Sequence, residues 1–394
     1  MPTRRLRRAL LAALPLLVAC VAGLPARAAA GPPAGTAAAL QHVLDAFLAE
    51  NPQAPGLTAW VLCPPLDLEW SGAAGTVARN DTRPLTPAHT FRIASNTKTY
   101  VAATVLRLAE AGRLSLDAPL ADLLPPDLAT VLAADGYALE AMTVRQVLSH
   151  TAGLADHSGD DRYGEAIIAD PAHAWTREEQ VRRCAAMFDP LGPAPAPYRY
   201  SDTGYVLLGG IVERVTGKPL AAAVREQLGF ARLGLGATWW ENAEPVPAGA
   251  GPRAHQYIDT HDVTGWDPSF DLYGGGGLVA DVRDLGKFMR ALLEGNVLGQ
   301  DASLAAMTGG GTAPYRLGLM VPDLDGHLGF GHQGFWNTFA FHLPSLDATV
   351  AGSILSHDAA NGRILAARLA ACLAAAMPAG SPATAPAATE TAGD

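Results

Sequence analysis

An almost continuous apolar helix, predicted to follow Ser95, constrains the fold of this chain more than any other segment. Few polar residues interrupt it before Arg107 and Glu110, and Gly112 then provides a stop signal. Its apolar residues are Val101, Ala102, Ala103, Val105, Leu106, Leu108 and Ala109. Because the helix has little polar face, we expect it to be buried in a core.

The first turn of this helix carries Ser95-Asn96-Thr97-Lys98. Residues three apart lie on one helix face, so the Lys98 amine can reach the Ser95 hydroxyl. A serine becomes a nucleophile when a neighbour accepts its proton, and unpaired N–H groups at a helix start favour the negative charge of a tetrahedral intermediate. The alternative interpretation is a helix start with one solvated lysine, because Ser-x-x-Lys is common by chance. A lysine on the first turn of a buried helix favours chemistry.

The length and composition predict a globular protein of one or two closely packed domains. The chain has 394 residues, of which 49% are hydrophobic and 17% charged, enough to bury a large core. Without the first 30 residues, which contain five arginines and no acid, 23 basic residues face 38 acidic ones. The resulting charge of −15 argues against nucleic acid as a partner. Cys63, Cys184 and Cys372 lack metal-binding spacing, so we expect structural or free thiols, with one disulfide as the alternative.

The N-terminus has the pattern of an export signal. Four arginines between positions 4 and 8 precede an apolar run over residues 9–23, which is too short to span a bilayer, and small-residue cleavage sites follow. This predicts a signal peptide over residues 1–30. Alternatively, Leu17-Val18-Ala19-Cys20 resembles a lipoprotein cleavage box, with a signal over 1–19 and a lipid anchor on Cys20. Either pattern predicts a periplasmic, secreted or membrane-anchored protein.

Hydrophobic periodicity and turn residues predict the remaining elements. Helices are expected at 37–50, 143–148, 176–187, 203–216, 219–228, 281–293 and 362–377, and strands at 56–62, 66–77, 315–321, 327–335, 337–343 and 348–355. Residues 378–394, rich in Ala, Pro, Thr and Gly, are expected to form a disordered tail.

These elements predict an α/β fold with an all-α region. Strands from both ends of the chain can share one antiparallel sheet flanked by helices, with a helical domain inserted beside it and a cleft between the two. We expect a single catalytic domain over residues 36–377. Its sheet parts cover about 36–90 and 270–377, and its helical part covers about 91–269.

Two later segments offer groups that a lysine-activated serine requires. Tyr200 and Asp202, two residues apart before a predicted helix, would face the same side; the alternative is an ordinary helix N-cap by Ser201 or Asp202. In Gly331-His332-Gln333-Gly334-Phe335-Trp336, glycines on a predicted strand permit close backbone approach by a ligand; the alternative is a strand with a bulge.

In this order, the three segments resemble the motifs of the serine β-lactamase and D-Ala-D-Ala carboxypeptidase superfamily. The family pattern is Ser-x-x-Lys, then Tyr-x-Asn, then Lys-Thr-Gly or His-x-Gly. The branch that fits holds class C β-lactamases, DD-carboxypeptidases and related esterases. Flanking stretches such as Leu148–Leu154 and Tyr205–Gly209 are also similar, so the resemblance covers about residues 40–375.

The resemblance implies a role for each matching residue. Ser95 would be the acylated nucleophile and Lys98 its proton partner, while Tyr200 would relay a proton to the leaving group. The N–H groups of Ser95 and Phe335 would form the oxyanion hole. No metal or organic cofactor is implied. The implied partner is a small molecule or a peptidoglycan-like peptide, and the sequence does not define an oligomeric state.

The residues expected to contact substrate include two departures from the family pattern. Asp202 replaces the usual amide, and an ionised acid cannot donate hydrogen bonds and would favour the ammonium form of Lys98. His332 stands where β-lactamases usually carry lysine, which leaves a substrate carboxylate without an obvious permanent cation, with Arg253 and Lys287 as candidate substitutes. Gly334 would lie beside the substrate and Trp336 would wall the pocket.

The sequence therefore predicts an exported serine hydrolase that forms an acyl-enzyme on Ser95. Its expected substrates are D-Ala-terminated peptides, as for a D-Ala-D-Ala carboxypeptidase, or small esters. The alternatives are a class C-like β-lactamase and a penicillin-binding or sensor module without turnover.

Overall fold

The computed structural model describes residues 34–311 and 313–378. The predicted signal over 1–30, its Cys20 alternative and nearly all of the predicted tail lie outside the described residues. Within the described part, no helix is long and apolar enough to cross a membrane. The three cysteines there are free thiols, as expected, and the alternative of a disulfide is not realised.

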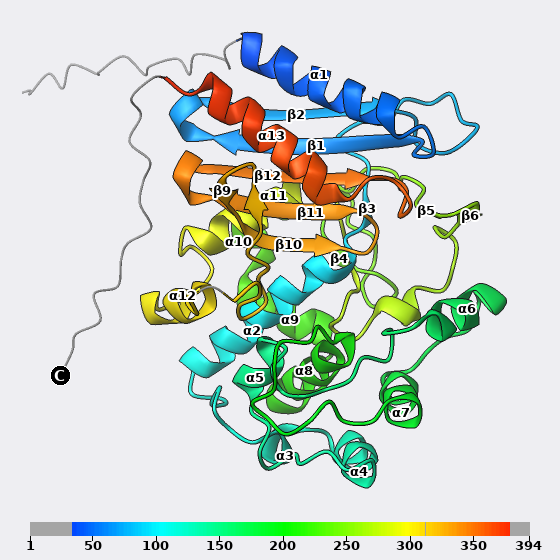
Figure 1. The fold of residues 1–394 in the computed structure, drawn as a ribbon, viewed down its shortest axis with the longest axis vertical. Coiled ribbons are helices and arrows are strands. Elements are labelled where there is room, and N and C mark those ends of the chain that lie inside the picture. The colour runs from blue at the N-terminus through cyan, green and yellow to red at the C-terminus, as the bar shows by residue number, and fades with distance from the viewer. Residues whose placement is uncertain (1–33, 312, 379–394) are drawn as a thin grey trace, which may run out of the picture.

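A five-stranded antiparallel sheet joins the two ends of the chain. Its strand order is β10-β11-β12-β1-β2, so the last strand in sequence pairs with the first, with Trp60 opposite Ala351. The strands are β1 (Gly56–Cys63), β2 (Leu68–Gly75), β10 (Phe330–Gly334), β11 (Thr338–Leu343) and β12 (Ala348–Ile354). This arrangement, visible in Figure 1, confirms the predicted sheet.

Helices cover both faces of this sheet. Helices α1 (Ala34–Glu50) and α13 (Gly362–Ala376) pack together on one face, and α11 (Val282–Leu293) packs on the other (Figure 1). Alternate residues of each strand point to opposite faces. Val61 and Val350 accordingly join the core under α1 and α13, whereas Trp60 joins the core that contains α11.

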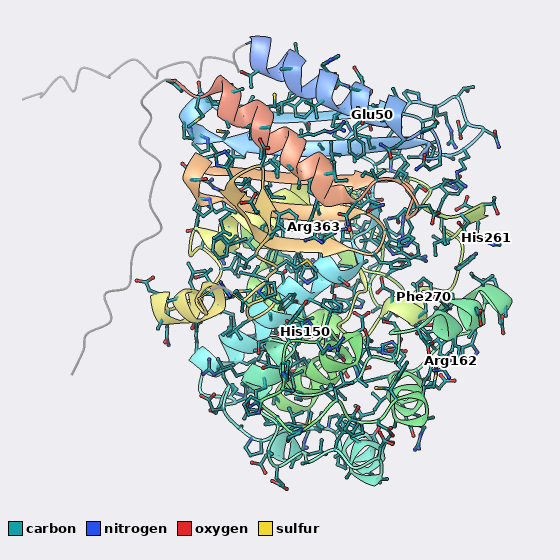
Figure 2. The ribbon with its side chains drawn as sticks, in the orientation of Figure 1. Glu50, His150, Arg162, His261, Phe270 and Arg363 are labelled. Carbon is teal, nitrogen blue, oxygen red and sulfur yellow. The ribbon has the colours of Figure 1, made fainter. Side chains whose placement is uncertain are left out.

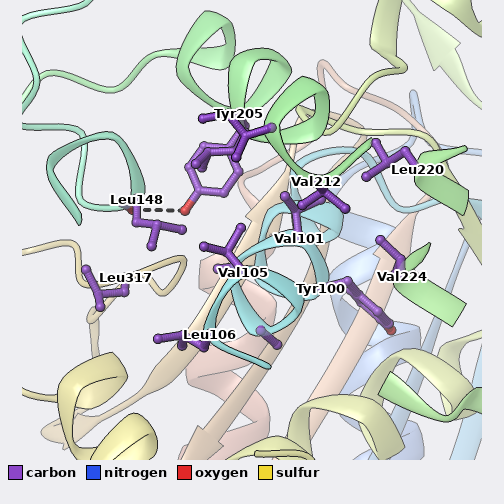
Figure 3. Packing of buried hydrophobic residues seen from close by; sticks show 14 of the residues in the cluster. Tyr100, Val101, Val105, Leu106, Leu148, Tyr205, Val212, Leu220, Val224 and Leu317 are labelled. Carbon is purple, nitrogen blue, oxygen red and sulfur yellow. Dashed lines mark hydrogen bonds between the residues drawn. The ribbon is translucent and has the colours of Figure 1, made fainter. Parts of the chain in front are cut away.

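The helical region builds its core around α2 (Thr97–Glu110), which is buried from Thr97 to Leu106, as its composition predicts. Figure 3 shows this core, in which the Tyr205 hydroxyl donates to the Leu148 carbonyl at 2.9 Å. Tyr100 stacks on Phe288 of α11 with ring centroids 3.5 Å apart, which ties the helical region to the sheet. The other helices of this region are α3 (Leu120–Leu123), α4 (Pro126–Ala134), α5 (Val144–Leu148), α6 (Asp161–Ala169), α7 (Arg177–Met187), α8 (Asp202–Thr216), α9 (Leu220–Leu228) and α10 (Phe230–Leu233).

Short elements connect the two regions. Strands β3 (Phe91–Arg92), β7 (Leu278–Ala280) and β4 (Trp239–Trp240) form a three-stranded sheet, and β5 (Tyr257–Ile258) pairs with β6 (His261–Asp262). Helix α12 (Asp301–Thr308) and the hairpin β8 (Asp323–Leu324) with β9 (His327–Leu328) precede β10. The η segments are single 3-10 turns: η1 (Pro64–Leu66), η2 (Ala94–Asn96), η3 (Pro268–Asp271) and η4 (Pro344–Leu346).

The strand predicted over 315–321 is wrong. Gly318 has φ +78°, which reverses the chain, and the Arg316 N–H donates to the Leu319 carbonyl at 2.7 Å within the resulting turn. Only two isolated bridges remain, one between Tyr315 and Met320 and one between Met320 and Gly331. Alternation of residue types alone does not reveal such a turn, because a glycine adopts positive φ without steric penalty.

Gly286 allows α11 to lie close to the sheet. A Cβ at this position would be 2.1 Å from Cε3 of the Trp60 side chain, and Trp60 is fully buried. We predict that Gly286→Ala lowers the free energy of unfolding by about 2 kcal/mol or more, because a packed core resists an added methyl group. Urea denaturation measures this change.

Gly164 of α6 is the matched control, since a Cβ there meets no atom within 4 Å. We expect Gly164→Ala to stabilise the protein by up to about 1 kcal/mol through helix propensity. Equal effects of the two substitutions would contradict the close packing described for Trp60.

Candidate active site

Ser95 lies in the 3-10 turn that precedes α2. Ala94, just before it, has φ +44°, a region that residues with a Cβ seldom adopt and that is often found at functional sites. Thr338 of β11 stabilises the turn, because its hydroxyl donates to the Ile93 carbonyl at 2.9 Å and accepts from Asn96 Nδ2 at 2.9 Å. The sheet therefore fixes the position of the serine.

Lys98 is fully buried and donates to three acceptors. Its Nζ is 2.9 Å from Ser95 Oγ and 2.7 Å from the Gly275 carbonyl, and it forms an ion pair with Asp202 Oδ1. An ammonium has three hydrogens and no acceptor, so these partners satisfy it completely. The contact with Ser95 has the geometry that a proton transfer requires.

Asp202 begins α8 and uses both carboxylate oxygens. Ser201 caps the helix by accepting from the Gly204 N–H at 3.1 Å, which leaves Asp202 free to contact Lys98 and Ser158. The Ser158 hydroxyl donates to Asp202 Oδ2 at 2.8 Å. Burial alone would raise the pKa of Asp202, but the charge of Lys98 and the hydrogen bonds outweigh it and hold this pKa well below its ordinary value. Asp202 is therefore ionised and accepts hydrogen bonds.

Ser158 links Asp202 to a second carboxyl group that sequence reasoning missed. Its hydroxyl lies 3.1 Å from Asp156 Oδ1. Burial, followed by repulsion from Asp202, raises the pKa of Asp156 to about 7. Residues 155–160 form a loop without periodicity or motif, so the sequence carries no signal that places them beside the serine.

Tyr200 lies over Lys98, with its ring centroid 5.0 Å from Nζ. Burial and then the charge of Asp202 raise the pKa of Tyr200 well above its ordinary value, while a hydrogen bond with Ser95 acts in the opposite direction. The phenol is thus protonated at neutral pH and suited to donate a proton. His150 packs on its ring with centroids 4.4 Å apart.

His332 is fully buried and faces Tyr315, whose hydroxyl is 2.9 Å from Nε2. Its Nδ1 lies 2.7 Å from the Gln333 carbonyl, so Nδ1 carries the hydrogen and Nε2 accepts from Tyr315. Burial lowers the pKa of His332 to about 3, which keeps the ring neutral. The ring is outside the lining of the cavity beside Ser95.

Gly334 permits a close approach within the protein. A Cβ there would be 2.4 Å from the Ile93 carbonyl oxygen and 3.1 Å from the Ala94 Cβ. The glycine thus lets β10 lie against the turn that carries Ser95. We expected the glycines of this strand to make room for a ligand. At Gly334 the room is taken by the protein's own chain instead.

A cavity of about 570 Å³ opens beside Ser95. Asp202, Phe335 and Trp336 line it together with Ser95, whereas Lys98 does not. Phe335 is half exposed and stacks on His357, while Trp336 is buried. The structure thus brings the segments around Ser95, Asp202 and Phe335 to one cavity.

The far wall of the cavity comes from residues that the sequence analysis did not single out. Apolar side chains of α6 and of the η3 region line it side by side, since the Tyr163 hydroxyl donates to the Phe270 carbonyl at 3.0 Å, and Figure 2 labels Phe270 next to α6. These apolar residues include Tyr163, Ile167, Ile168, Phe270 and Leu272. Neither Lys287 nor Arg253 lines the cavity, and Arg253 instead pairs with Glu241 at 3.1 Å. Across residues 34–311 and 313–378, no group of three acidic, His or Cys side chains is suited to hold a metal.

An antiparallel sheet, an inserted helical region and a Ser-x-x-Lys turn between them define a class of serine hydrolases. The Beta-lactamase family model matches residues 31–375, so the chain belongs to the β-lactamase family. Esterases, amidases and penicillin-binding proteins also belong to the β-lactamase-related serine hydrolases.

Individual relatives cover different activities. The chain is 35% identical over 221 residues to Esterase EstB of Burkholderia gladioli, covering 54% of this chain and 53% of the esterase. It is 30% identical to Penicillin-binding protein 4 of Amycolatopsis lactamdurans, over 66% of this chain and 70% of that protein. The chain thus spans about half the length of the esterase that it matches.

Solved structures share the fold over most of the chain. A D-stereospecific amidohydrolase from Streptomyces sp. is 28% identical, with a TM-score of 0.71 over 88% of this chain and 99% of that one. The D-amino acid amidase from Ochrobactrum anthropi SV3 has a TM-score of 0.73 at 24% identity, over 87% of this chain and all of that one.

We predict that Asp156→Asn makes stability less sensitive to pH. Asp156 binds its proton more tightly in the folded protein than in the unfolded chain, so the wild type loses stability as pH rises from about 4 to about 7. Asparagine cannot ionise, yet its oxygen still accepts from Ser158. Urea denaturation at pH 4.5 and 7.5 should show the variant gaining about 1 kcal/mol or more over wild type at the higher pH. A difference between the two proteins that does not change with pH would contradict the raised pKa of Asp156.

Proposed function

We propose that this protein is an exported serine hydrolase that forms an acyl-enzyme on Ser95 and acts mainly on small esters. The observation that carries the proposal is the 2.9 Å contact between Lys98 Nζ and Ser95 Oγ at the wall of a 570 Å³ cavity. The similarity to Esterase EstB supports the ester class. Export rests on the signal-like pattern of residues 1–30, with a lipid anchor on Cys20 as its variant.

Proton transfer begins from the Lys98–Asp202 ion pair. Lys98 can accept the Ser95 proton only after it passes one of its own to Asp202, which turns the ion pair into a neutral pair within the same contact. Ser95 Oγ then bonds to the ester carbonyl carbon, and the N–H groups of Ser95 and Phe335 stabilise the oxyanion. Tyr200 donates its proton to the departing alkoxide, and Lys98 then gives the proton that it took from Ser95 to the Tyr200 phenolate. Water then hydrolyses the acyl-enzyme, releasing the acid and free Ser95.

The state of Asp202 favours esters over β-lactams and peptides. Its two oxygens are occupied by Lys98 and Ser158, and it has no N–H to offer to a substrate amide carbonyl. His332 is neutral and buried, so it does not supply a cation for a substrate carboxylate. These observations support our proposal that esters are better substrates than D-Ala-D-Ala peptides and β-lactams.

Loss of the serine hydroxyl tests the proposed acyl-enzyme. We predict that Ser95→Ala lowers kcat/KM for 4-nitrophenyl butyrate by about 1,000-fold or more, because the nucleophile is absent. Ser115→Ala, an exposed serine outside the cavity lining, is the control and should retain wild-type turnover. Turnover by Ser95→Ala at the wild-type rate would overturn the assignment. A single burst of acylation by wild type without further turnover would instead support a penicillin-binding or sensor module.

Replacement of the acid tests the predicted substrate preference. Asp202→Asn removes the carboxylate that takes the Lys98 proton, but it also removes the charge that favours the ammonium form, so the buried Lys98 can adopt the neutral amine directly. The asparagine keeps an oxygen that accepts from Lys98 and adds an amide N–H₂ that can donate to a substrate amide. We expect the ratio of kcat/KM for nitrocefin to that for 4-nitrophenyl butyrate to rise by about 10-fold or more. An unchanged ratio would show that Asp202 does not set the preference between the two classes.

A further inference from the structure

Acidic residues predominate among the charged groups that line the cavity. Within the described residues, six carboxylates line it, from Asp160, Asp161, Glu165, Asp202, Asp271 and Asp358, and no lysine or arginine does. Lys98 and Arg162 neutralise Asp202 and Asp160 from outside the lining. The cavity therefore presents an excess of negative charge to a substrate.

The buried histidine of the cavity, His157, does not offset this charge. His157 is buried, and burial lowers its pKa to about 4, so its ring is neutral at pH 7. His357 directs Nδ1 to the Phe335 carbonyl at 2.8 Å and stacks on the Phe335 ring. Among the described residues, a substrate carboxylate would meet repulsion from these acids and no lysine or arginine in the lining.

Asp271 lines the cavity, interacts electrostatically with Asp202 and Lys98, and lacks a partner of its own among the described residues. In the described part of the chain, its side chain takes part in no hydrogen bond or ion pair, although it lines the cavity. A Cβ on Gly276 would lie 2.3 Å from Asp271 Oδ1, so the carboxyl group rests against the backbone next to Gly275, which binds Lys98. Burial, followed by repulsion from Asp202, raises the pKa of Asp271 to about 7.

Gln180 offers a second acceptor without a donor. It is fully buried and lines the same cavity, and its Oε1 has no hydrogen-bond partner. Its Nε2 is held by the Tyr163 hydroxyl and by the carbonyls of Ser269 and Phe270, the residue before Asp271. A buried acceptor without a donor is unfavourable, so a ligand that brings N–H groups would correct it.

We propose that the substrate carries an ammonium group beside a hydrophobic group, with Asp271 and Gln180 accepting from the ammonium and the α6 wall covering the hydrophobic part. Amino-acid esters are the simplest compounds of this class. The inference builds on the proposed acyl-enzyme function and assigns the charge of its substrate. An ammonium would also favour the ionised form of Asp271, since an opposite charge at short range lowers the pKa of a carboxyl group.

Three probes of one shape and different charge test this assignment. Benzylamine is a cation, benzyl alcohol is neutral and benzoate is an anion at pH 7.5. We measure each as an inhibitor of 4-nitrophenyl butyrate hydrolysis and determine its Kd by titration calorimetry. Benzylamine should bind about 10-fold or more tightly than benzyl alcohol, and benzoate should bind most weakly. Absence of esterase activity would refute the proposed function. Calorimetry requires no turnover, so it would still test the present inference in that case.

Substitution of the carboxylate locates the preference. Asp271→Asn should reduce the advantage of benzylamine over benzyl alcohol to less than about 3-fold, and Asp271→Glu should restore part of it. Asp127→Asn, an exposed acid of α4 outside the cavity lining, should leave the advantage unchanged. Benzoate binding as tightly as benzylamine would overturn the inference, as would an advantage that survives in a folded Asp271→Asn protein.

Discussion

The buried ammonium of Lys98 is the interaction on which the arrangement of the site depends. A charge removed from water is unfavourable by several kcal/mol unless good geometry and hydrogen bonds compensate for it. Lys98 obtains this compensation from the turn before α2, from Asp202 at the start of α8 and from the Gly275 carbonyl before β7. Three segments distant in sequence are thereby held around one nitrogen. Loss of any one of these three acceptors would leave the buried ammonium of Lys98 partly unpaired.

The backbone around this charge is packed closely enough to restrict the residue types. Gly334 lets β10 meet the Ile93 carbonyl, and Thr338 ties that turn to β11. Ala94 accepts a left-handed conformation so that Ser95 faces the cavity. The sheet, built from both ends of the chain, thus positions a serine that belongs to the helical region. Disturbance of the sheet is expected to reach the site through these contacts.

The parts of the fold with strong local signals were predictable from sequence. The continuous apolar run of α2 predicted the buried helix, the mostly apolar segments of β1 and β12 predicted strands of the sheet, and the order of the three motifs predicted the family. The pairing of Lys98 with Asp202 followed from their chemistry. Ser158 and Asp156 could not be predicted, because they lie in a loop whose position depends on tertiary contacts.

Other features depended on details that residue patterns do not encode. The turn at Gly318 ended a strand that alternation suggested, because the conformation of one glycine reverses the chain. The orientation of His332 toward Tyr315 depends on a residue 17 positions earlier. The wall formed by α6 and Phe270 arises only when η3 packs against α6. The motifs therefore predicted the nucleophilic serine from the sequence, whereas the residues that line the cavity beside it are evident only in the folded structure.

The rate at which a phosphonate ester modifies Ser95 tests the central claim most directly. It should be compared in the wild type and in the double variant Lys98→Met with Asp202→Asn, which removes both charges together and leaves neither one buried alone. If Lys98 activates Ser95 through the pair, modification of the double variant should be slower by about 100-fold or more, the usual contribution of a positioned proton acceptor. Equal rates in the two folded proteins would contradict the account.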